Sequence, residues 1–204
     1  MVGSSIIKRA FVHARLSSVD GVNLGFHRSD VQLWWQGKGG LRIGDVARFL
    51  RTLLQYEDEP NALILHVGGN DIGQVPLRQL RYDIVCLFND VKSLLPNTTI
   101  IWSQILPRLH WRNEFSHMAL ERARVRLNSL AATVALSSGG GYVRYPEIVE
   151  ANHGLFCDNV HLSHIGNDIL LYRLHQAILA FFEMKCNFVA PPMGEFGPWL
   201  STLV

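Results

Sequence analysis

The sequence predicts an α/β protein built around a parallel β-sheet. Short apolar runs alternate along the chain with longer segments in which apolar residues recur every three or four positions. The run from Ala62 to Val67 is almost continuously apolar, as expected of a strand that is buried on both faces. We therefore expect helices between four strands, near residues 31–35, 62–67, 99–103 and 142–145.

The first half of the chain supplies the elements around the buried strand. Leu33–Trp34–Trp35 is predicted to be a strand that ends at the Gly37–Gly40 turn. Residues 43–56 follow as a helix, and residues 76–95 form a second helix that ends at Pro96–Asn97. The apolar stripe of the first helix consists of Ile43, Val46, Ala47, Leu50, Leu53 and Leu54.

The second half repeats this alternation. Thr99–Trp102 is a β-branched and aromatic strand, and Tyr142–Tyr145 is a shorter one. A long helix over residues 113–135 stops before Gly139–Gly141, and Ser163 is placed to cap the last helix. The buried stripe of that last helix is predicted to consist of Ile165, Ile169, Leu170, Leu174, Ile178 and Phe181.

The composition fits one globular domain, because 204 residues can bury a sizeable core. The net charge is +2 with acids and bases interspersed, so no basic patch indicates nucleic-acid binding. The scattered Cys86, Cys157 and Cys186 lack C-x-x-C spacing, and we expect reduced thiols in a cytoplasmic protein. We see no signal-peptide pattern and no apolar run near the ~20 residues of a membrane span. Residues 184–204, interrupted by Pro191–Pro192, are expected to form an irregular tail.

A pair of residues near the end of the chain indicates catalysis. Asp158 lies three residues before His161, just ahead of the last predicted helix. Histidine has the pKa range of a general base, and a nearby carboxylate can fix its tautomer and orientation. Ser5 lies at the start of the chain, and Gly40 and Asn70 each follow a predicted strand. Because ligands bind at the carboxyl ends of parallel strands, we expect all five residues on one rim of the sheet.

Together these residues supply the parts of a nucleophilic site. A serine hydroxyl is a weak nucleophile that needs an adjacent base, which His161 would provide to Ser5. The backbone N–H groups of Ser5 and Gly40 and the side-chain amide of Asn70 could donate to a developing oxyanion. Each feature alone is more simply a turn, a helix start or a packed histidine. Their order along the chain favours the catalytic interpretation.

This order of blocks, Gly-x-Ser, Gly, Gly-x-Asn-Asp and Asp-x-x-His, resembles the SGNH (GDSL-type) hydrolase superfamily. The resemblance defines residues 1–183 as an SGNH hydrolase-like domain. The spacing and the Gly37–Gly40 turn are most similar to the catalytic subunits of platelet-activating-factor acetylhydrolase. The segment Trp34–Gly40 also resembles SGNH domains of fish genomes, some of which are associated with retrotransposons.

The resemblance implies a flavodoxin-like, three-layer α/β/α sandwich with a five-stranded parallel sheet. It implies a serine esterase that acts on a small or short-acyl ester without a metal or organic cofactor. Carried over by position, Ser5 is the nucleophile, Asp158 and His161 complete the triad, and Ser5, Gly40 and Asn70 form the oxyanion hole. As partners we expect the ester substrate and a second copy of the chain in a homodimer, and neither nucleic acid nor a membrane.

Two departures from the family pattern bear on activity. The first block usually reads Gly-Asp-Ser, and Ser4 replaces the aspartate here, so we expect altered activity. The first strand is largely missing, because only Met1 and Val2 precede Gly3. Three or four absent apolar side chains, at about 1.5–3 kcal/mol each, would forfeit roughly 5–12 kcal/mol, against a domain stability of about 5–15 kcal/mol. A truncated start, another segment in the position of the first strand, or a chain of marginal stability would each account for the short first strand.

Three other interpretations stay open. Cys157, Asp158, His161 and His164 could ligate a metal, although no closed four-ligand spacing supports this. A catalytically inactive SGNH fold, kept as a binding or self-association module, would fit the short first strand and Ser4. A nucleic-acid-associated accessory domain is suggested only by the retrotransposon resemblance, and the near-neutral charge argues against it.

Overall fold

A computed structural model describes residues 1–16, 20–111 and 116–186 of the chain. At its centre is a five-stranded sheet of order β2-β1-β3-β4-β5, in which each neighbouring pair is parallel. The strands are β1 (Val2–Gly3), β2 (Gln36–Gly37), β3 (Ala62–His66), β4 (Thr99–Ser103) and β5 (Gly141–Val143). The predicted parallel α/β architecture is therefore confirmed.

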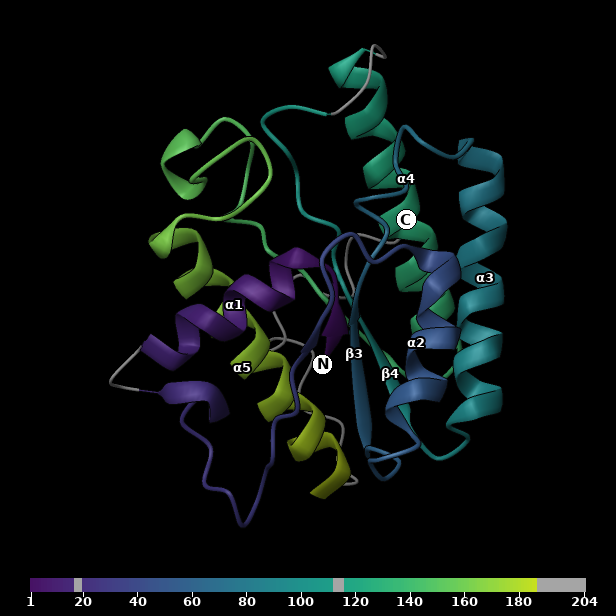
Figure 1. Cartoon of the computed structure of the whole chain (residues 1–204), viewed down its shortest axis with the longest axis vertical. Coiled ribbons are helices and arrows are strands. Elements are labelled where there is room, and N and C mark those ends of the chain that lie inside the picture. Colours follow the sequence, from purple (N-terminus) through teal and green to yellow (C-terminus); the bar gives the residue numbers. More distant parts are fainter. Residues whose placement is uncertain (17–19, 112–115, 187–204) are drawn as a thin grey trace.

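Within the described residues, five α-helices cover the two faces of the sheet (Figure 1). One face carries α1 (Ser5–Leu16) and α5 (His164–Cys186), which contact each other. The other face carries α2 (Val46–Leu53), α3 (Leu77–Leu94) and α4 (His117–Ser137). Short 3₁₀ helices lie in the connections at Gly21–Asn23, Ile43–Asp45 and His153–Leu155. The result is a three-layer α/β/α sandwich.

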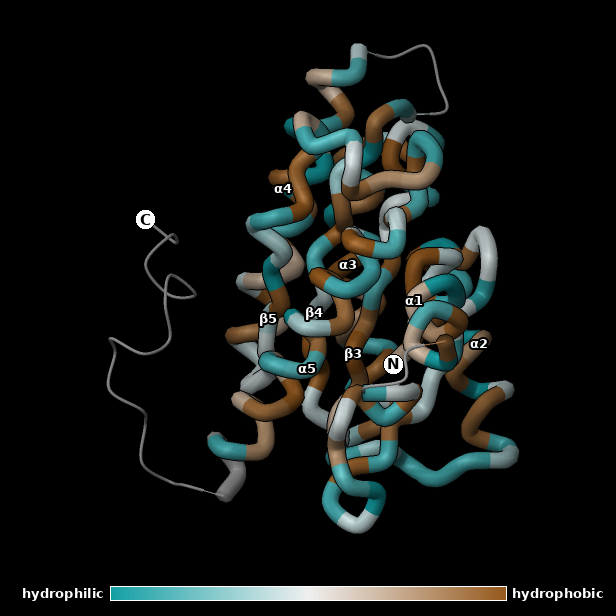
Figure 2. The backbone as a smooth tube through the Cα atoms, turned by 90° about the vertical axis from the view of Figure 1, so that its left-hand side faces the viewer, coloured by the Kyte–Doolittle hydropathy of each residue, from teal (hydrophilic) through white to brown (hydrophobic). Residues whose placement is uncertain are grey.

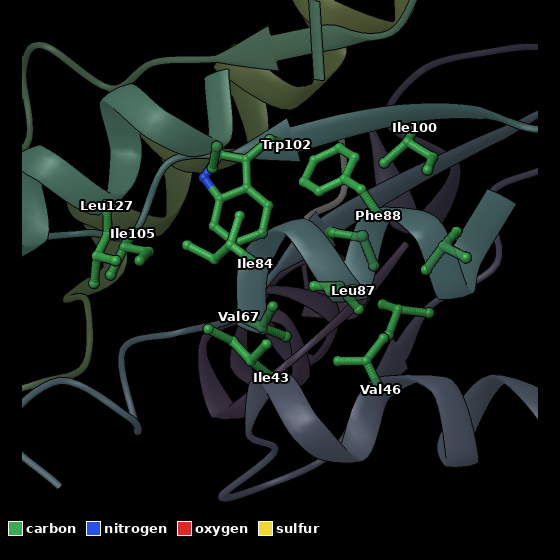
Figure 3. Close-up of a cluster of buried hydrophobic side chains, with 14 of the residues drawn as sticks. Ile43, Val46, Val67, Ile84, Leu87, Phe88, Ile100, Trp102, Ile105 and Leu127 are labelled. Carbon is green, nitrogen blue, oxygen red and sulfur yellow. The ribbon is translucent and has the colours of Figure 1, made fainter. Parts of the chain in front are cut away.

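Successive residues of the central strands belong alternately to two apolar clusters, one on each face of the sheet. Leu63 and Leu65 of β3 belong to the cluster under α2, α3 and α4, whereas Ile64 belongs to the cluster under α1 and α5. Trp102 of β4 is fully buried beside Phe88 of α3, with ring centroids 6.1 Å apart (Figure 3). Figure 2 shows the apolar residues of β3 and β4 running through the interior. Cover on both faces explains why the central residues of both strands are apolar.

The first strand is short, as expected, yet it lies in the middle of the sheet. Val2 pairs with Gln36 of β2 and with Leu65 of β3, and its side chain is inaccessible to solvent. At Gly3 there is no room for a side chain, because a Cβ atom would lie 2.8 Å from the His66 carbonyl oxygen. This glycine allows α1 to begin directly at the end of a central strand.

The strand predicted at residues 31–35 is wrong, because pairing with β1 begins only at Gln36. The side chain of Asn23 satisfies the backbone of this segment instead. Its oxygen accepts a hydrogen bond from the Leu33 N–H at 3.0 Å, and its amide donates to the Val31 carbonyl at 2.9 Å. A local side-chain partner thus takes the place of a neighbouring strand.

The last helix begins as predicted, but its buried stripe differs at one position. The Ser163 hydroxyl caps α5 by accepting a hydrogen bond from the Gly166 N–H at 3.3 Å. The predicted burial of Ile165 is wrong, since this residue is 63% exposed. Gly166 faces the preceding loop, where a Cβ atom would collide with the Leu155 carbonyl. The first turn therefore directs Ile165 outward.

Other boundaries move slightly. The strand predicted at 142–145 is found at Gly141–Val143, and α5 continues to Cys186, into the tail predicted at 184–204. The remainder of that tail, residues 187–204, lies outside the described residues, as does the predicted helix start at residue 113. None of the described helices is long and apolar enough to cross a membrane.

Candidate active site

The loops that follow the strands carry the predicted site residues at the carboxyl edge of the sheet. Ser5 follows β1 as the first residue of α1, and Gly40 follows β2 in an exposed turn with a φ of 74°. Asn70 lies in the turn after β3, and the connection from β5 to α5 carries Asp158 and His161. A parallel sheet gathers such loops at one edge, which is where ligands bind in folds of this class.

Three of these side chains form a continuous hydrogen-bonded chain. His161 Nε2 lies 2.9 Å from Ser5 Oγ, and His161 Nδ1 lies 2.7 Å from Asp158 Oδ2. The imidazole side chain is 15% exposed, so protein atoms surround most of it. When Nδ1 carries the proton and donates it to the carboxylate, Nε2 accepts the hydrogen bond of the serine hydroxyl.

The Asp158 carboxylate is held by its own loop. Its Oδ1 accepts hydrogen bonds from the backbone N–H groups of Val160 and His161, both at 2.7 Å. The Arg9 guanidinium of α1 lies 3.8 Å from Oδ2. Partial burial would raise the pKa of Asp158, but the hydrogen bonds from the His161 N–H, the His161 ring and the Val160 N–H lower it to about 2. The carboxylate is therefore ionised at neutral pH and fixed against the imidazole.

Contacts with two strands hold Ser5 in place. The Ser4 N–H donates to the His66 carbonyl at 3.2 Å, and the Ser4 carbonyl accepts the first helical hydrogen bond from Lys8 N–H at 3.2 Å. Gly37 of β2 allows the helix to approach, because a Cβ atom there would overlap the Lys8 backbone. The start of α1 is thus held against β2 at Gly37 and, through the preceding Ser4, against β3. Ser5 lies in this first turn, where backbone N–H groups have no intrahelical acceptor.

Asn70 joins the loop after β3 to the loop after β2. Its Nδ2 donates to the Leu41 carbonyl at 3.1 Å, and its Oδ1 accepts from Arg108 Nη2 at 3.1 Å. The adjacent Asp71 is buried and accepts a hydrogen bond from the Ile43 N–H at 3.3 Å. Burial raises the pKa of Asp71 to about 6, although the Ile43 N–H opposes the shift. The two loops are therefore bonded at two points, which places Asn70 beside the residue that follows Gly40.

A small pocket opens beside Ser5. It is lined by neighbours of the site residues, namely Ser4, Ile6, Gly69 and Val160, together with His66 and the segment Ile105–Arg108. His66 Nδ1 lies 2.9 Å from Ser103 Oγ, which in turn lies 2.6 Å from the Tyr145 hydroxyl. Burial, reinforced by the charge of Arg108, lowers the pKa of His66 to about 4, so this ring is neutral. The pocket therefore combines apolar walls with one cation.

The alternative set of metal ligands does not come together. Among the described residues, Cys157, Asp158, His161 and His164 do not bring their ligand atoms to one point. Asp158 and His161 bond to each other, whereas the His164 ring lies beside the His13 ring, with centroids 5.2 Å apart. Arg9 contacts Asp158 and Arg108 contacts Asn70, and neither arginine is predicted from the sequence, because no motif spacing indicates these contacts.

The sequence matches neither a protein-family model nor a curated protein, but the structure resembles solved ones. It matches a GDSL-like lipase from Bacteroides thetaiotaomicron with a TM-score of 0.62 and 18% identity, covering 88% of this chain and 86% of that one. It matches a family 3 carbohydrate esterase from Clostridium thermocellum with a TM-score of 0.61 and 18% identity, covering 91% and 96%. It matches a catalytic mutant of an acetylxylan esterase from Geobacillus stearothermophilus with a TM-score of 0.61 and 15% identity, covering 87% and 91%. The chain therefore has the fold of the SGNH (GDSL-type) hydrolase superfamily.

Proposed function

We propose that the chain is a serine esterase that hydrolyses a small or short-acyl ester through an acyl-enzyme, with Ser5 as the nucleophile. The observation that carries this proposal is the hydrogen-bonded chain from Ser5 through His161 to Asp158, with contacts of 2.9 and 2.7 Å. The esterase and lipase names of the structural neighbours support the same class of reaction.

His161 acts first as a general base. As Ser5 Oγ forms a bond to the ester carbonyl carbon, its proton passes to His161 Nε2 and the carbonyl electron pair moves onto oxygen. The ionised Asp158 stabilises the resulting imidazolium through Nδ1–H. His161 then returns the proton to the alcohol oxygen as the ester C–O bond breaks, and the acyl group remains on Ser5. Water activated by the same imidazole releases the acid.

The oxyanion formed in these steps needs donors at the end of the sheet. The Ser5 N–H belongs to the first turn of α1, where the helix dipole favours negative charge. The Asn70 amide has two N–H groups and donates one to Leu41, so the second can serve the oxyanion. With the Gly40 N–H as the third donor, the loss of one donor should cost about 3–4 kcal/mol of barrier.

Ser4 occupies the place of the family's usual aspartate, yet the visible support of Ser5 does not require an acidic side chain. The contact from residue 4 to the His66 carbonyl is made by the backbone N–H, which any residue except proline supplies. The chain from Ser5 to Asp158 is complete with serine at this position. These observations favour an active enzyme over an inactive binding module.

The pocket supports a short acyl group. Its lining includes Ile6 and Val160, the sequence neighbours of Ser5 and His161, together with Leu106. The pocket is so small that only a group of about methyl size would fit, which favours an acetyl group over longer acyl chains. The acetylxylan esterase among the structural neighbours agrees with an acetyl-sized group. We expect p-nitrophenyl acetate to be turned over faster than longer p-nitrophenyl esters.

Turnover of p-nitrophenyl acetate by Ser5→Ala and His161→Ala tests the proposal. Each substitution should lower kcat by a factor on the order of 10⁴ or more. Matched controls are Ser129→Ala, on the exposed side of α4, and His27→Ala, whose exposed ring contacts Ser29 in the segment before β2. Undiminished turnover in Ser5→Ala would refute the nucleophile, and equal turnover in wild type and His161→Ala would favour the binding module.

The expected homodimer and cytoplasmic location, and the domain limits of residues 1–183, stay predictions. Light scattering of the purified chain measures its mass directly. A monomer at micromolar concentration would contradict the homodimer.

A further inference from the structure

Arg108 contacts Asn70 on the side opposite to Leu41. The Arg108 guanidinium donates to Asn70 Oδ1, and Asn70 Nδ2 donates to the Leu41 carbonyl, both at 3.1 Å. The two ends of an asparagine amide have nearly the same shape, so its partners decide which end carries the donors. If the amide turned over, its N–H groups would face the guanidinium and its oxygen would face a carbonyl oxygen. Both contacts therefore select one orientation.

The Arg108 guanidinium is itself supported from α4. It lies over the ring of the buried Trp111, 4.9 Å from the centroid. Trp111 Nε1 donates to Glu121 Oε1 at 3.1 Å, and Arg124 Nε donates to Glu121 Oε2 at 2.7 Å. Arg124 Nη1 also donates to the Ile105 carbonyl at 3.0 Å, in the segment that carries Arg108. These contacts connect Trp111 through α4 back to the segment that carries Arg108, and they restrict the movement of the guanidinium.

Gly69 contributes the space that Arg108 occupies. A Cβ atom at residue 69 would lie 3.0 Å from Arg108 Nη2, so a side chain there would press on the guanidinium. The glycine directly before Asn70 thus permits the arginine to reach the amide oxygen. A cation bonded to that oxygen also polarises the amide and makes its N–H groups stronger donors.

We propose that Arg108 is a positioning residue that orients and polarises the Asn70 amide, so that the N–H not bonded to Leu41 stays available to the oxyanion. This inference rests on the proposed esterase function, because it assigns Asn70 a task that exists only during ester hydrolysis. In this assignment Arg108 acts through Asn70 and not through a bond of its own to the reacting atoms. Its contribution should therefore appear in kcat and leave KM nearly unchanged.

The expected effect follows from the value of one oxyanion donor. Removal of such a donor costs about 10²–10³ in kcat, and a misoriented amide should lose part of that. Arg108→Met keeps much of the side-chain length and removes the donor and charge, so we expect kcat to fall about 10–100-fold with KM within about twofold. Arg108→Lys keeps the charge and one donor direction, and should recover part of the loss.

A double-mutant cycle with p-nitrophenyl acetate as the probe tests this assignment. It compares wild type, Asn70→Ala, Arg108→Met and the double variant, and thermal unfolding confirms that each chain is folded. If Arg108 acts through Asn70, Arg108→Met should cost nothing further, within about twofold, once Asn70 is alanine. Losses that multiply in the double variant would overturn the inference. Arg173→Met is the control, because that arginine pairs with Glu147 outside the site.

These variants distinguish a failure of the role of Arg108 from a failure of the proposed esterase function. If Ser5→Ala retains the turnover, the esterase assignment itself fails. If turnover depends on Ser5 but Asn70→Ala or Arg108→Met leaves kcat unchanged, the esterase stands and the role of Arg108 is refuted. A kcat loss in Arg108→Lys as large as that in Arg108→Met, with both chains folded, would likewise contradict an effect of the positive charge.

Discussion

Asp158→Asn replaces one carboxylate oxygen by an amide nitrogen and keeps the size of the side chain. The asparagine oxygen can still accept from the Val160 and His161 backbone N–H groups, which hold Oδ1 at 2.7 Å in the native chain. The new amide nitrogen would then face His161 Nδ1 at the position of Oδ2. Since this nitrogen is a donor, the ring must present a lone pair at Nδ1 and carry its proton on Nε2. In that tautomer His161 cannot take the proton of Ser5.

The size of the effect follows from this change of tautomer and from the exposure of the carboxylate. The same substitution in a fully buried Ser-His-Asp triad lowers kcat about 10⁴-fold, or about 5–6 kcal/mol at roughly 1.4 kcal/mol per tenfold. The Asp158 side chain is 45% exposed, so water can partly compensate the lost charge. We therefore expect a loss on the order of 10³–10⁴ in kcat, with KM nearly unchanged.

Initial rates with p-nitrophenyl acetate at neutral pH measure this loss. The matched control is Asp168→Asn, because Asp168 Oδ1 also contacts a histidine, His13 Nε2 at 2.6 Å, but outside the chain that ends at Ser5. A kcat for Asp158→Asn within about threefold of wild type would show that the carboxylate does not orient His161. The same large loss in Asp168→Asn would show that the effect is not specific to the site.

Three further predictions concern stability. The pKa of Asp158 is lowered from 3.8 to about 2 in the folded chain, so its contribution to stability is present above about pH 4 and is lost as the pH falls toward 2. The difference in Tm between wild type and Asp158→Asn should therefore disappear over that range. A difference in Tm that stays constant would contradict this pKa shift. Gly37→Ala should destabilise the chain by about 1–3 kcal/mol in urea unfolding, since its Cβ atom would overlap the Lys8 backbone, and an unchanged midpoint would contradict this close approach. Trp102→Ala should cost about 3–5 kcal/mol, whereas the 65% exposed Tyr82→Ala should stay within about 0.5 kcal/mol, and equal effects would contradict the described core.

The buried strands could be predicted because a strand that is covered on both faces has a run of apolar residues. Ala62–His66 and Thr99–Ser103 lie between two helical layers, so the central residues of each strand, Leu63–Leu65 and Ile100–Trp102, are all apolar. The carboxyl ends of parallel strands share one edge, so Asn70 could be assigned to that edge from its place directly after β3. The order of the motif blocks then related the predicted sheet and Asn70 to the fold family.

Helix α1 was missed although its signal is present. Its buried residues, Ile6, Ile7, Ala10 and Ala14, recur at helical spacing, but two of them are alanines and give a weak apolar stripe. The strand misplaced at residues 31–35 has another cause. Two tryptophans favour a strand locally, whereas the side chain of Asn23, ten residues before Leu33, satisfies the backbone there.

The support of the site could not be predicted from spacing. Arg108 and Asn70 are 38 residues apart, and Arg9 and Asp158 belong to opposite ends of the chain. Contacts of this kind depend on how two loops meet after the sheet is assembled, and no periodicity of helix or strand encodes them. The sequence therefore indicates the candidate catalytic residues but not the residues that hold them in place.

Covalent labelling measures whether His161 activates Ser5 as a nucleophile. The intact chain is treated with a fluorophosphonate, and the modified residue is located by peptide mass spectrometry. We expect one label per chain on Ser5, no label in Ser5→Ala, and greatly slowed labelling in His161→Ala, where the base 2.9 Å from the hydroxyl is removed. A folded chain that takes no label at Ser5, or takes it equally fast without His161, would show that His161 does not activate Ser5.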